Sequence, residues 1–321
     1  MEETVNSLTI TNLTTITEVI LLSIASFSNC RSVMFTVFLM MFLLTVLGNS
    51  LIISAIRMSV QLHTPMYLFL SNLAFLDICY TSITIPNILS AILNNRNTIS
   101  FTGCFVQLGL FTVCASTECI LLAVMAYDRY VAICHPLRYR AIVNRTVCLY
   151  LAFFAWLSGS LNSAFNTTAA SDLYFCGPNA IESMWCETQP IIHLACSNTY
   201  IIDVLNSIGG TVFGVGCLIF ILTSYVFILV AIFRIPSKTS RQKTFSTCTS
   251  HMTIVALYFG ALSFMYVLPH KTSSQKIDSI ISMMYAIFTP MLNPIIYSLR
   301  NQQIIGAMKN ILLLFHKKGF D

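Results

Sequence analysis

Seven apolar runs, each long enough to cross a lipid bilayer, constrain the fold of this chain more than any other feature. A bilayer core about 30 Å thick takes about 20 helical residues, and a helix satisfies its own backbone polar groups in lipid. The sequence predicts seven such helices, over residues 33–57, 65–92, 104–130, 147–166, 200–233, 244–268 and 277–299. We therefore expect an all-α membrane protein, built as a seven-transmembrane helix bundle.

The scarcity of charge agrees with this class. Only 9% of the 321 residues are charged and 56% are hydrophobic, whereas soluble domains carry about 25% charged residues. The basic residues lie in short segments between the apolar runs and form no continuous face, which argues against a nucleic-acid partner. The 12 cysteines include no CxxC pair and no Cys/His cluster at zinc spacing, so we expect no metal centre. Residues 1–30 lack the pattern of a cleavable signal peptide.

The distribution of lysine and arginine predicts the orientation in the membrane. With the amino terminus outside, 13 of the 17 basic residues fall in cytoplasmic segments, as the positive-inside rule requires. We expect an extracellular segment 1–32, a transmembrane domain 33–299 with a long extracellular loop 167–199, and a cytoplasmic tail 300–321. Residues 301–318 of the tail are too short and too charged to cross the bilayer, and predict an amphipathic helix on the membrane surface.

Asn12 and four cysteines fall on the outer side in this orientation. Asn12 opens an Asn-Leu-Thr sequence, which predicts a glycosylation site. Cys104 lies 25 residues before Arg129, about 37 Å along a helix, so the two residues lie at opposite membrane faces. The other outer cysteines are Cys176, Cys186 and Cys196. An oxidising compartment favours two disulfides over free thiols, and four cysteines allow three pairings.

Charged residues inside or beside the apolar runs mark candidate functional positions. Arg129 follows Asp128 at the inner edge of the third span, where a charged pair is costly unless it is satisfied. The alternative interpretation is an interface anchor that extends its charge into water. The histidines show no ligand spacing, and we interpret all of them as structural or exposed.

Two further acids lie deeper, Asp77 in the second span and Glu118 in the third. Asn49 and Asn293 fall at similar depth on the first and seventh spans. This polar core can hold water, a proton or a sodium ion; the alternative is a hydrogen-bonded packing network with neutral acids. Since no nucleophile or metal cluster accompanies the acids, we expect no enzyme and no other cofactor.

Prolines and glycines interrupt two of the spans. Pro290 and Pro294 each remove a backbone donor from the seventh span and favour a kink, which predicts a hinge beside Asn293. The stretch GGTVFGVG at 209–216 lies inside the fifth span, so it is no phosphate loop. It predicts close helix packing or room for a pocket.

Six motifs in register show that the chain resembles the odorant receptor family of rhodopsin-like G-protein-coupled receptors. They are Gly48–Asn49, LHTPMYLFLSNLAFLD at 62–77, MAYDRYVAICHPLRY at 125–139, Ser224–Tyr225, KTFSTCTSH at 243–251 and PMLNPIIYSLRN at 290–301. The departures from the family pattern are small: Ala74 and Thr249 stand where the family usually has serine, and Glu187 where it usually has aspartate.

The resemblance implies roles for several residues. It pairs Cys104 with Cys186 and Cys176 with Cys196. It implies that Asp128 restrains Arg129 at rest and that activation releases Arg129 to receive a G-protein α subunit. The switch set that the family pattern implies is Asp128, Arg129, Tyr130, Tyr225, Asn293, Pro294 and Tyr297.

By analogy with the family, the outer half of the bundle holds the ligand. Positions at comparable height on four spans, with Glu187 of the long loop over the entrance, form the expected wall. They are Phe111, Thr112, Ala115, Ser116, Cys119, Glu187, Asn206, Gly210, Phe213, Tyr258, Leu262, Met265 and Met283. This mixture of residues suits a small, volatile, largely apolar molecule with one hydrogen-bonding group.

The expected function is that of an odorant receptor in the plasma membrane that activates a stimulatory heterotrimeric G-protein and raises cyclic AMP. Two alternatives belong to other classes. One is a secondary transporter with Asp77 and Glu118 as a proton relay, which the lack of evident internal repeats disfavours. The other is a rhodopsin-like receptor for a peptide or lipid, which the odorant-type motif at 243–251 and the extra loop cysteines disfavour.

Overall fold

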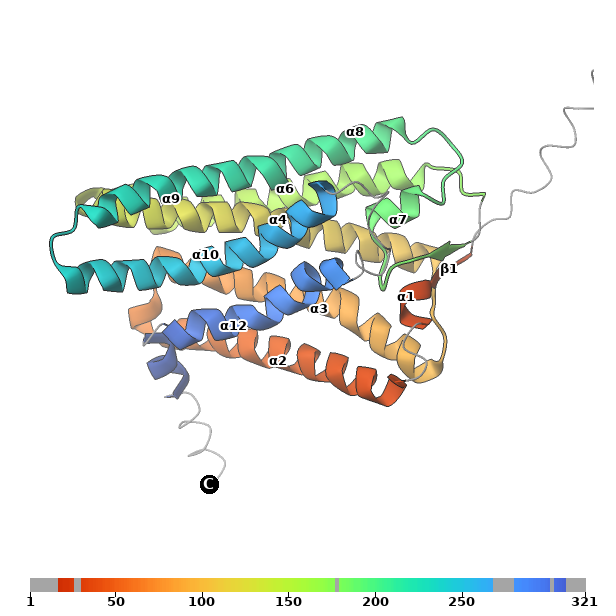
Figure 1. Ribbon diagram of the computed structural model, residues 1–321, viewed down its shortest axis with the longest axis horizontal. Helices are drawn as coiled ribbons and strands as arrows, with labels where there is room; N and C mark the ends of the chain where they lie inside the picture. Colours follow the sequence, from red (N-terminus) through yellow and green to blue (C-terminus); the bar gives the residue numbers. More distant parts are fainter. Residues whose placement is uncertain (1–16, 26–29, 177–178, 268–279, 301–302, 310–321) are drawn as a thin grey trace, which may run out of the picture.

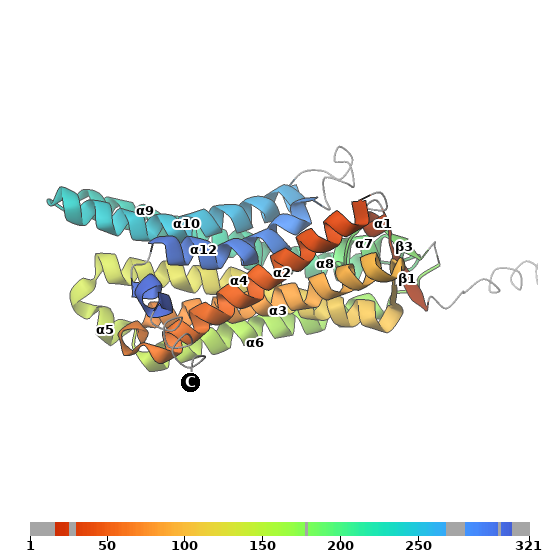
Figure 2. The ribbon, with the colours of Figure 1, turned by 90° about the horizontal axis from the view of Figure 1, so that it is seen from below.

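The computed structural model describes residues 17–25, 30–176, 179–267, 280–300 and 303–309 (Figure 1). Long helices run side by side along the molecule and form a bundle (Figures 1 and 2). They are α2 (Arg31–Met58), α3 (Pro65–Asn94), α4 (Phe101–Cys134), α6 (Arg145–Ser171), the continuous rod of α8 (Tyr200–Gly209), η4 (Gly210–Gly216) and α9 (Cys217–Phe233), α10 (Lys238–Val267), and the rod that includes η5 (Met284–Phe288) and α12 (Thr289–Arg300).

The predicted spans match these helices in order and type. Six of the helices within the described ranges are long and apolar enough to cross a membrane, and α10 is the further helix of the bundle. Several helices begin or end beyond the apolar runs that predicted them. The helix predicted over 147–166 is Arg145–Ser171, since Asn144 caps its start by accepting from the Val147 amide at 3.0 Å. The helix predicted over 244–268 begins at Lys238. Hydropathy marks only the stretch that lies in lipid, whereas backbone hydrogen bonding carries a helix further.

Short elements connect the long helices. At one end they are η2 (Val60–Leu62), η3 (Pro136–Arg138) and α5 (Tyr139–Ile142); at the other they are β1 (Glu18–Leu21), α1 (Leu22–Ala25), β2 (Thr98–Ser100), β3 (Ala180–Ile181) and α7 (Thr188–Ile192). Residues 303–309 are α-helical and lie within residues 301–318, over which the sequence predicts an amphipathic helix. The glycosylation position Asn12 lies outside the described residues.

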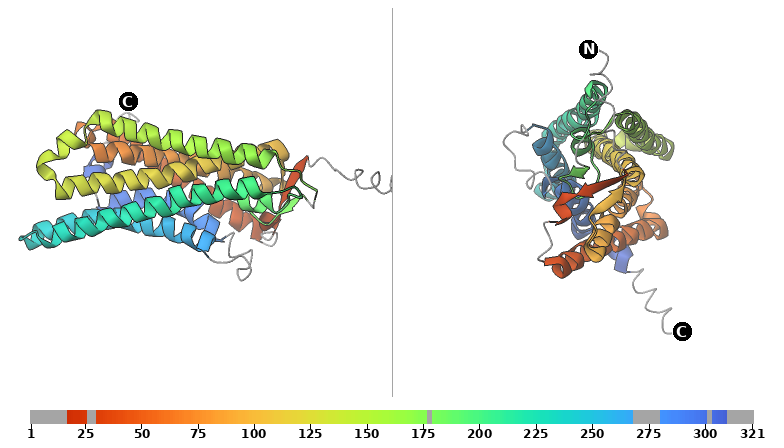
Figure 3. Two further views of the ribbon diagram at one scale, coloured as in Figure 1. Left: turned by 90° about the horizontal axis from the view of Figure 1, so that it is seen from above. Right: turned by 90° about the vertical axis from the view of Figure 1, so that its right-hand side faces the viewer.

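A small sheet and two disulfides close one end of the bundle, which we call the disulfide end. The strand order is β2-β1-β3, with β1 antiparallel to β2 and parallel to β3. Figure 3 shows β1 lying across this end, and the side chains of Val19 and Leu21 are buried. The disulfides join Cys104 to Cys186 and Cys176 to Cys196, the pairs that the resemblance implies. We call the opposite end, with η3 and α5, the Arg129 end.

Glycines set the closest helix approaches. A Cβ atom on Gly159 of α6 would lie 2.9 Å from the Val113 carbonyl oxygen of α4, so only glycine lets these two helices pack at this distance. A Cβ on Gly209 would lie 3.1 Å from the Asn162 side-chain oxygen, whereas one on Gly210 would meet nothing within 4 Å. The predicted glycine stretch thus combines close packing at its start with free space one residue later.

Both interrupted spans contain a π-helical turn. In the fifth it is η4, over the predicted glycine stretch, and in the seventh it is η5, directly before α12 with Pro290 and Pro294. Such turns insert an extra residue into the helical repeat and rotate the side chains that follow. The Thr289 hydroxyl donates to the Met284 carbonyl at 2.9 Å across the second of them. The two predicted irregular spans are therefore irregular in the structure.

Candidate functional site

At the Arg129 end, Asp128 and Arg129 contact different partners. The Tyr139 hydroxyl of α5 donates to Oδ1 of Asp128 at 2.7 Å, while the Arg129 guanidinium donates to Sδ of Met66 in α3. Neighbouring helical residues point about 100° apart, because a helix has about 3.6 residues per turn. Arg129 also acts electrostatically on the Asp128 carboxyl, and the restraint of Arg129 by Asp128 stays a prediction. Burial and the hydrogen bond to Asp128 raise the pKa of Tyr139, which keeps its hydroxyl protonated as a donor.

The buried side chain of His251 connects α4, α9 and α10 near the Arg129 end. The Tyr225 hydroxyl of α9 lies 2.8 Å from Nδ1 of His251 in α10, and the rings stack at 12°. Nε2 of His251 lies 3.2 Å from the Leu122 carbonyl of α4. A carbonyl only accepts, so Nε2 carries the proton and Nδ1 accepts from Tyr225. His251 is thus structural, as expected of the histidines, and holds the predicted switch residue Tyr225 in place.

The remaining predicted switch residues lie at separate positions. Tyr130 places its hydroxyl 3.2 Å from Nε2 of His135 at the end of α4. The hydroxyl of Tyr297 is buried and has no hydrogen-bond partner within the described ranges. Pro294 packs against α2, where a Cβ on Gly48 would lie 3.1 Å from the proline ring.

The predicted polar core divides into three parts in the structure. Asn293 of α12 donates to both carboxylate oxygens of Asp77 in α3, at 3.0 and 2.9 Å. Asn49 of α2 instead donates to the Pro290 carbonyl at 3.2 Å. Glu118 of α4 is fully buried at 0% exposure, and neither of its carboxyl oxygens has a hydrogen-bond partner among the described residues.

Towards the disulfide end, the predicted ligand-binding face of α4 meets α10. The Tyr258 hydroxyl donates to the Ala115 carbonyl at 2.9 Å, and Sγ of Cys119 lies 3.8 Å from the same hydroxyl. Both Cys119 and Tyr258 are buried. Three of the predicted ligand positions, on two helices, therefore lie in direct contact.

Phe111 centres a group of five aromatic side chains, which we call the aromatic cluster: Tyr80, Phe111, Trp185, Tyr258 and Tyr285. The Phe111 ring centroid lies 5.0 Å from that of Tyr80, 5.9 Å from Trp185 and 6.1 Å from Tyr285. Tyr258 lies 6.4 Å from Tyr285. Sequence reasoning missed Tyr80, Trp185 and Tyr285, although the position of Trp185 next to Cys186 was a usable signal.

Glu187, which follows Cys186 in the loop before α7, contacts this cluster. The Tyr285 hydroxyl donates to Oε2 of Glu187 at 3.4 Å, and the Cys104–Cys186 disulfide anchors the neighbouring residue. Glu187 therefore contacts the cluster at the disulfide end, and its predicted place over the entrance of a ligand site stays a prediction.

Gln107 of α4 binds the backbone of the same loop, a role that the sequence analysis did not predict. Its Nε2 donates to the Ile83 carbonyl at 2.8 Å, and its Oε1 accepts from the Cys186 amide at 2.9 Å. Ile83 lies three residues before Pro86, the proline inside α3. A buried glutamine in an apolar helix was the available signal.

The other predicted ligand positions are spread more widely. Ser116 accepts from Asn162 at 2.9 Å and so faces α6, and the Thr112 hydroxyl donates to the Leu108 carbonyl at 2.8 Å. Nδ2 of Asn206 is buried without a hydrogen-bond partner among the residues described. The half-buried positions that pack on the main core are Phe213, Leu262 and Met283. The side chain of Met265 lies outside the described part.

Comparisons with known proteins agree on one family. The family model for olfactory receptors matches residues 38–315. The chain is 47% identical to human olfactory receptor 2K2 over 280 residues, which cover 87% of this chain and 88% of that protein. It is 41% identical to mouse olfactory receptor 6Z7 over 302 residues, or 94% and 97% of the two chains.

The extent of these matches decides the class of the protein. The motifs, the bundle and the matched residues all point to a multi-pass membrane receptor of the G-protein-coupled class with an odorant-receptor role, and not to an enzyme. The match begins within α2 and covers every later long helix of the bundle. The chain therefore belongs to the olfactory receptor family.

Proposed function

We propose that this receptor binds a small, largely apolar odorant beside the aromatic cluster and activates a stimulatory heterotrimeric G-protein, which raises cyclic AMP. The observation that carries the proposal is the cluster itself. It brings together α3, α4, α10, η5 and the disulfide-anchored loop at one height of the bundle. Binding sites of this kind combine apolar walls with a few convergent polar groups.

Buried polar atoms without partners support a ligand with one hydrogen-bonding group. In the described residues these include the Tyr80 hydroxyl, the Trp185 Nε1 and the Asn206 Nδ2. Leaving such a group unpaired costs about 1–3 kcal/mol, so a ligand acceptor that reaches one of them gains that amount in affinity. The half of α4 nearest the disulfide end contains no acid, which makes an amine ligand less favoured.

The Tyr258–Ala115 hydrogen bond offers a route from the ligand to α10. A ligand shifts the conformational equilibrium only through its different affinities for the two states. Contacts that compete with Tyr258 for the Ala115 carbonyl favour a displaced α10. The same helix contains His251, which contacts Tyr225 of α9 near the Arg129 end. There, movement of α10 would expose Arg129 and the basic segments 129–145 and 234–243 to the G-protein.

Expression with a stimulatory G-protein tests the proposal. We would record cyclic AMP over a chemically diverse odorant panel, with surface delivery measured by an extracellular epitope. Tyr258→Phe, which keeps the ring and removes the hydroxyl, is expected to shift the odorant concentration for half-maximal response. Silence of a surface-delivered receptor over the whole panel contradicts the proposal, as does a response through an inhibitory G-protein alone.

We further propose that the polar core takes a sodium ion, with Glu118 and Asp77 as its charged ligands. The support is the buried Glu118 carboxyl, whose two oxygens lack partners within the described chain, since a buried charge needs a counter-charge. The melting temperature of the purified receptor should be higher in sodium than in choline chloride. Glu118→Gln should remove that difference; an equal difference in this variant contradicts sodium binding.

A further inference from the structure

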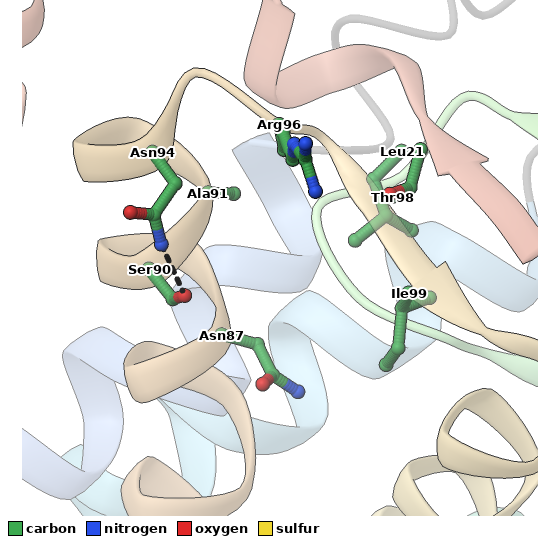
Figure 4. Close-up of a pocket in the computed structure, with 8 residues that line it drawn as sticks. All are labelled: Leu21, Asn87, Ser90, Ala91, Asn94, Arg96, Thr98 and Ile99. Carbon is green, nitrogen blue, oxygen red and sulfur yellow. Dashed lines mark hydrogen bonds between the residues drawn. The ribbon is translucent and has the colours of Figure 1, made fainter.

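A cavity lies at the disulfide end of the bundle, and its lining contains no residue of the aromatic cluster. It has a volume of about 540 Å³ and lies between the last turns of α3 and the sheet strands β1 and β2 (Figure 4). Its lining residues are Leu21, Asn87, Ser90, Ala91, Asn94, Arg96, Thr98 and Ile99. None of them belongs to the predicted ligand set.

Among the described residues, the polar lining of this cavity consists of one basic side chain and several neutral ones, with no acid. The charged residue is Arg96, whose side chain extends from the turn after α3 towards the space between α3 and β2 (Figure 4). Its guanidinium makes no hydrogen bond or ion pair with the rest of the described chain. Asn94 donates to Ser90 at 3.2 Å on the opposite wall, and Asn87 lies one turn further along α3.

The backbone holds Arg96 in this place. Asn95 ends α3 in the left-handed conformation with φ of 54°, which asparagine tolerates better than most residues. The Arg96 amide then donates back to the Ala91 carbonyl at 3.2 Å. Arg31 of α2 donates to the Asn95 side chain, so a second positive charge lies beside the cavity.

We propose that this cavity is a second binding site, for a small carboxylate with a short alkyl chain. A guanidinium presents paired N–H donors that match the two oxygens of a carboxylate. The side chains of Asn87, Ser90 and Thr98 add donors, and Leu21, Ala91 and Ile99 offer an apolar wall for the alkyl chain. The volume falls in the range of about 300–1,000 Å³ found for small-molecule sites.

The position of the cavity gives binding a structural consequence. One wall is α3 and the other is formed by β1 and β2, which come from the amino-terminal segment and the α3–α4 connection. A bound carboxylate therefore links the amino-terminal strand to the bundle. Arg96 has a purely structural alternative role, since a positive charge beside a helix carboxyl end stabilises the helix.

Thermal unfolding of the purified full-length receptor in nanodiscs separates the two roles. The probes are sodium hexanoate and 1-hexanol, which share an alkyl chain and differ in the carboxylate. Hexanoate should raise the melting temperature by mass action, and hexanol at equal concentration should not. Arg96→Gln should abolish the hexanoate shift, Arg96→Lys should reduce it, and Tyr258→Phe, in the aromatic cluster, should keep it.

Arg57→Gln is the matched control, because it removes an exposed arginine from the last turn of α2, at the Arg129 end and far from the cavity. It should leave the hexanoate shift unchanged. Hydrogen exchange provides the second measurement: hexanoate should slow amide exchange in residues 87–99 of the wild type. Equal shifts by hexanol, no shift in the wild type, or a full shift in Arg96→Gln would each overturn the proposal. None of these readouts depends on signalling, so the result is independent of the proposed odorant response.

Discussion

The side-chain amide of Asn293 donates to both carboxylate oxygens of Asp77, at 3.0 and 2.9 Å. Both side chains are buried, and the contact joins α3 to α12 across 216 residues of sequence. Two residues of the motifs that resemble the family thus form an interhelical contact, next to Pro294 in the irregular seventh span.

Removing the side-chain amide of Asn293 should lower the stability of the helix bundle. Asn293→Ala leaves the Asp77 carboxyl buried without this donor, at a cost of about 1–3 kcal/mol. Thermal unfolding in detergent measures the loss, and a double-mutant cycle with Asp77→Asn isolates the pair. Additive effects of the two substitutions would show that the contact contributes nothing.

Arg129→Ala should abolish G-protein activation while surface delivery is retained. Its guanidinium contacts Met66 in the structure, and its removal takes away the positive charge that we propose receives the G-protein. Cyclic AMP with an identified agonist is the readout. Arg57→Ala removes an exposed arginine at the same end, outside the basic segments proposed to meet the G-protein, and should signal normally; unimpaired signalling by Arg129→Ala contradicts the assigned role.

Tyr139→Phe should loosen the segment after α4. It deletes the 2.7 Å hydrogen bond to Asp128 that ties α5 to the bundle, which is worth about 1 kcal/mol. Amide hydrogen exchange over residues 135–143 should become faster. Tyr150→Phe, at an exposed tyrosine of α6, should leave exchange in that segment unaltered. Identical exchange in Tyr139→Phe and the wild type would mean that other contacts hold α5.

Gly159→Leu should prevent correct packing of α4 on α6. Even a Cβ there would lie 2.9 Å from the Val113 carbonyl and 3.1 Å from the Thr117 amide nitrogen, and backbone atoms cannot move aside cheaply. The amount of receptor at the cell surface, measured by flow cytometry, should fall to a small fraction of the wild-type level. Gly260→Ala, where a Cβ meets nothing within 4 Å, should be delivered normally.

The amino-acid sequence by itself determined the number, order and type of the long helices. The reason is that a chain in lipid must satisfy its backbone hydrogen bonds within each span, so the length of each apolar run already specifies a helix. It also located the irregular stretches, because Pro290 and the glycines at 209–216 act on their own backbone. The distribution of basic residues and the length of the third span together predict that four cysteines lie on one side of the membrane, and the resemblance implied their pairing.

Only the tertiary structure decided which side chains meet. The Asp128 carboxylate accepts a hydrogen bond from Tyr139, and the Asp77 carboxylate accepts from Asn293, while the Glu118 oxygens have no hydrogen-bond donor among the described residues. Such partners depend on the rotation of each helix and on its distance from its neighbours, which the spacing of residues along one span does not specify. The aromatic cluster and the Arg96 cavity each combine segments far apart in sequence, so their geometry exists only once the bundle and the β1 strand have come together.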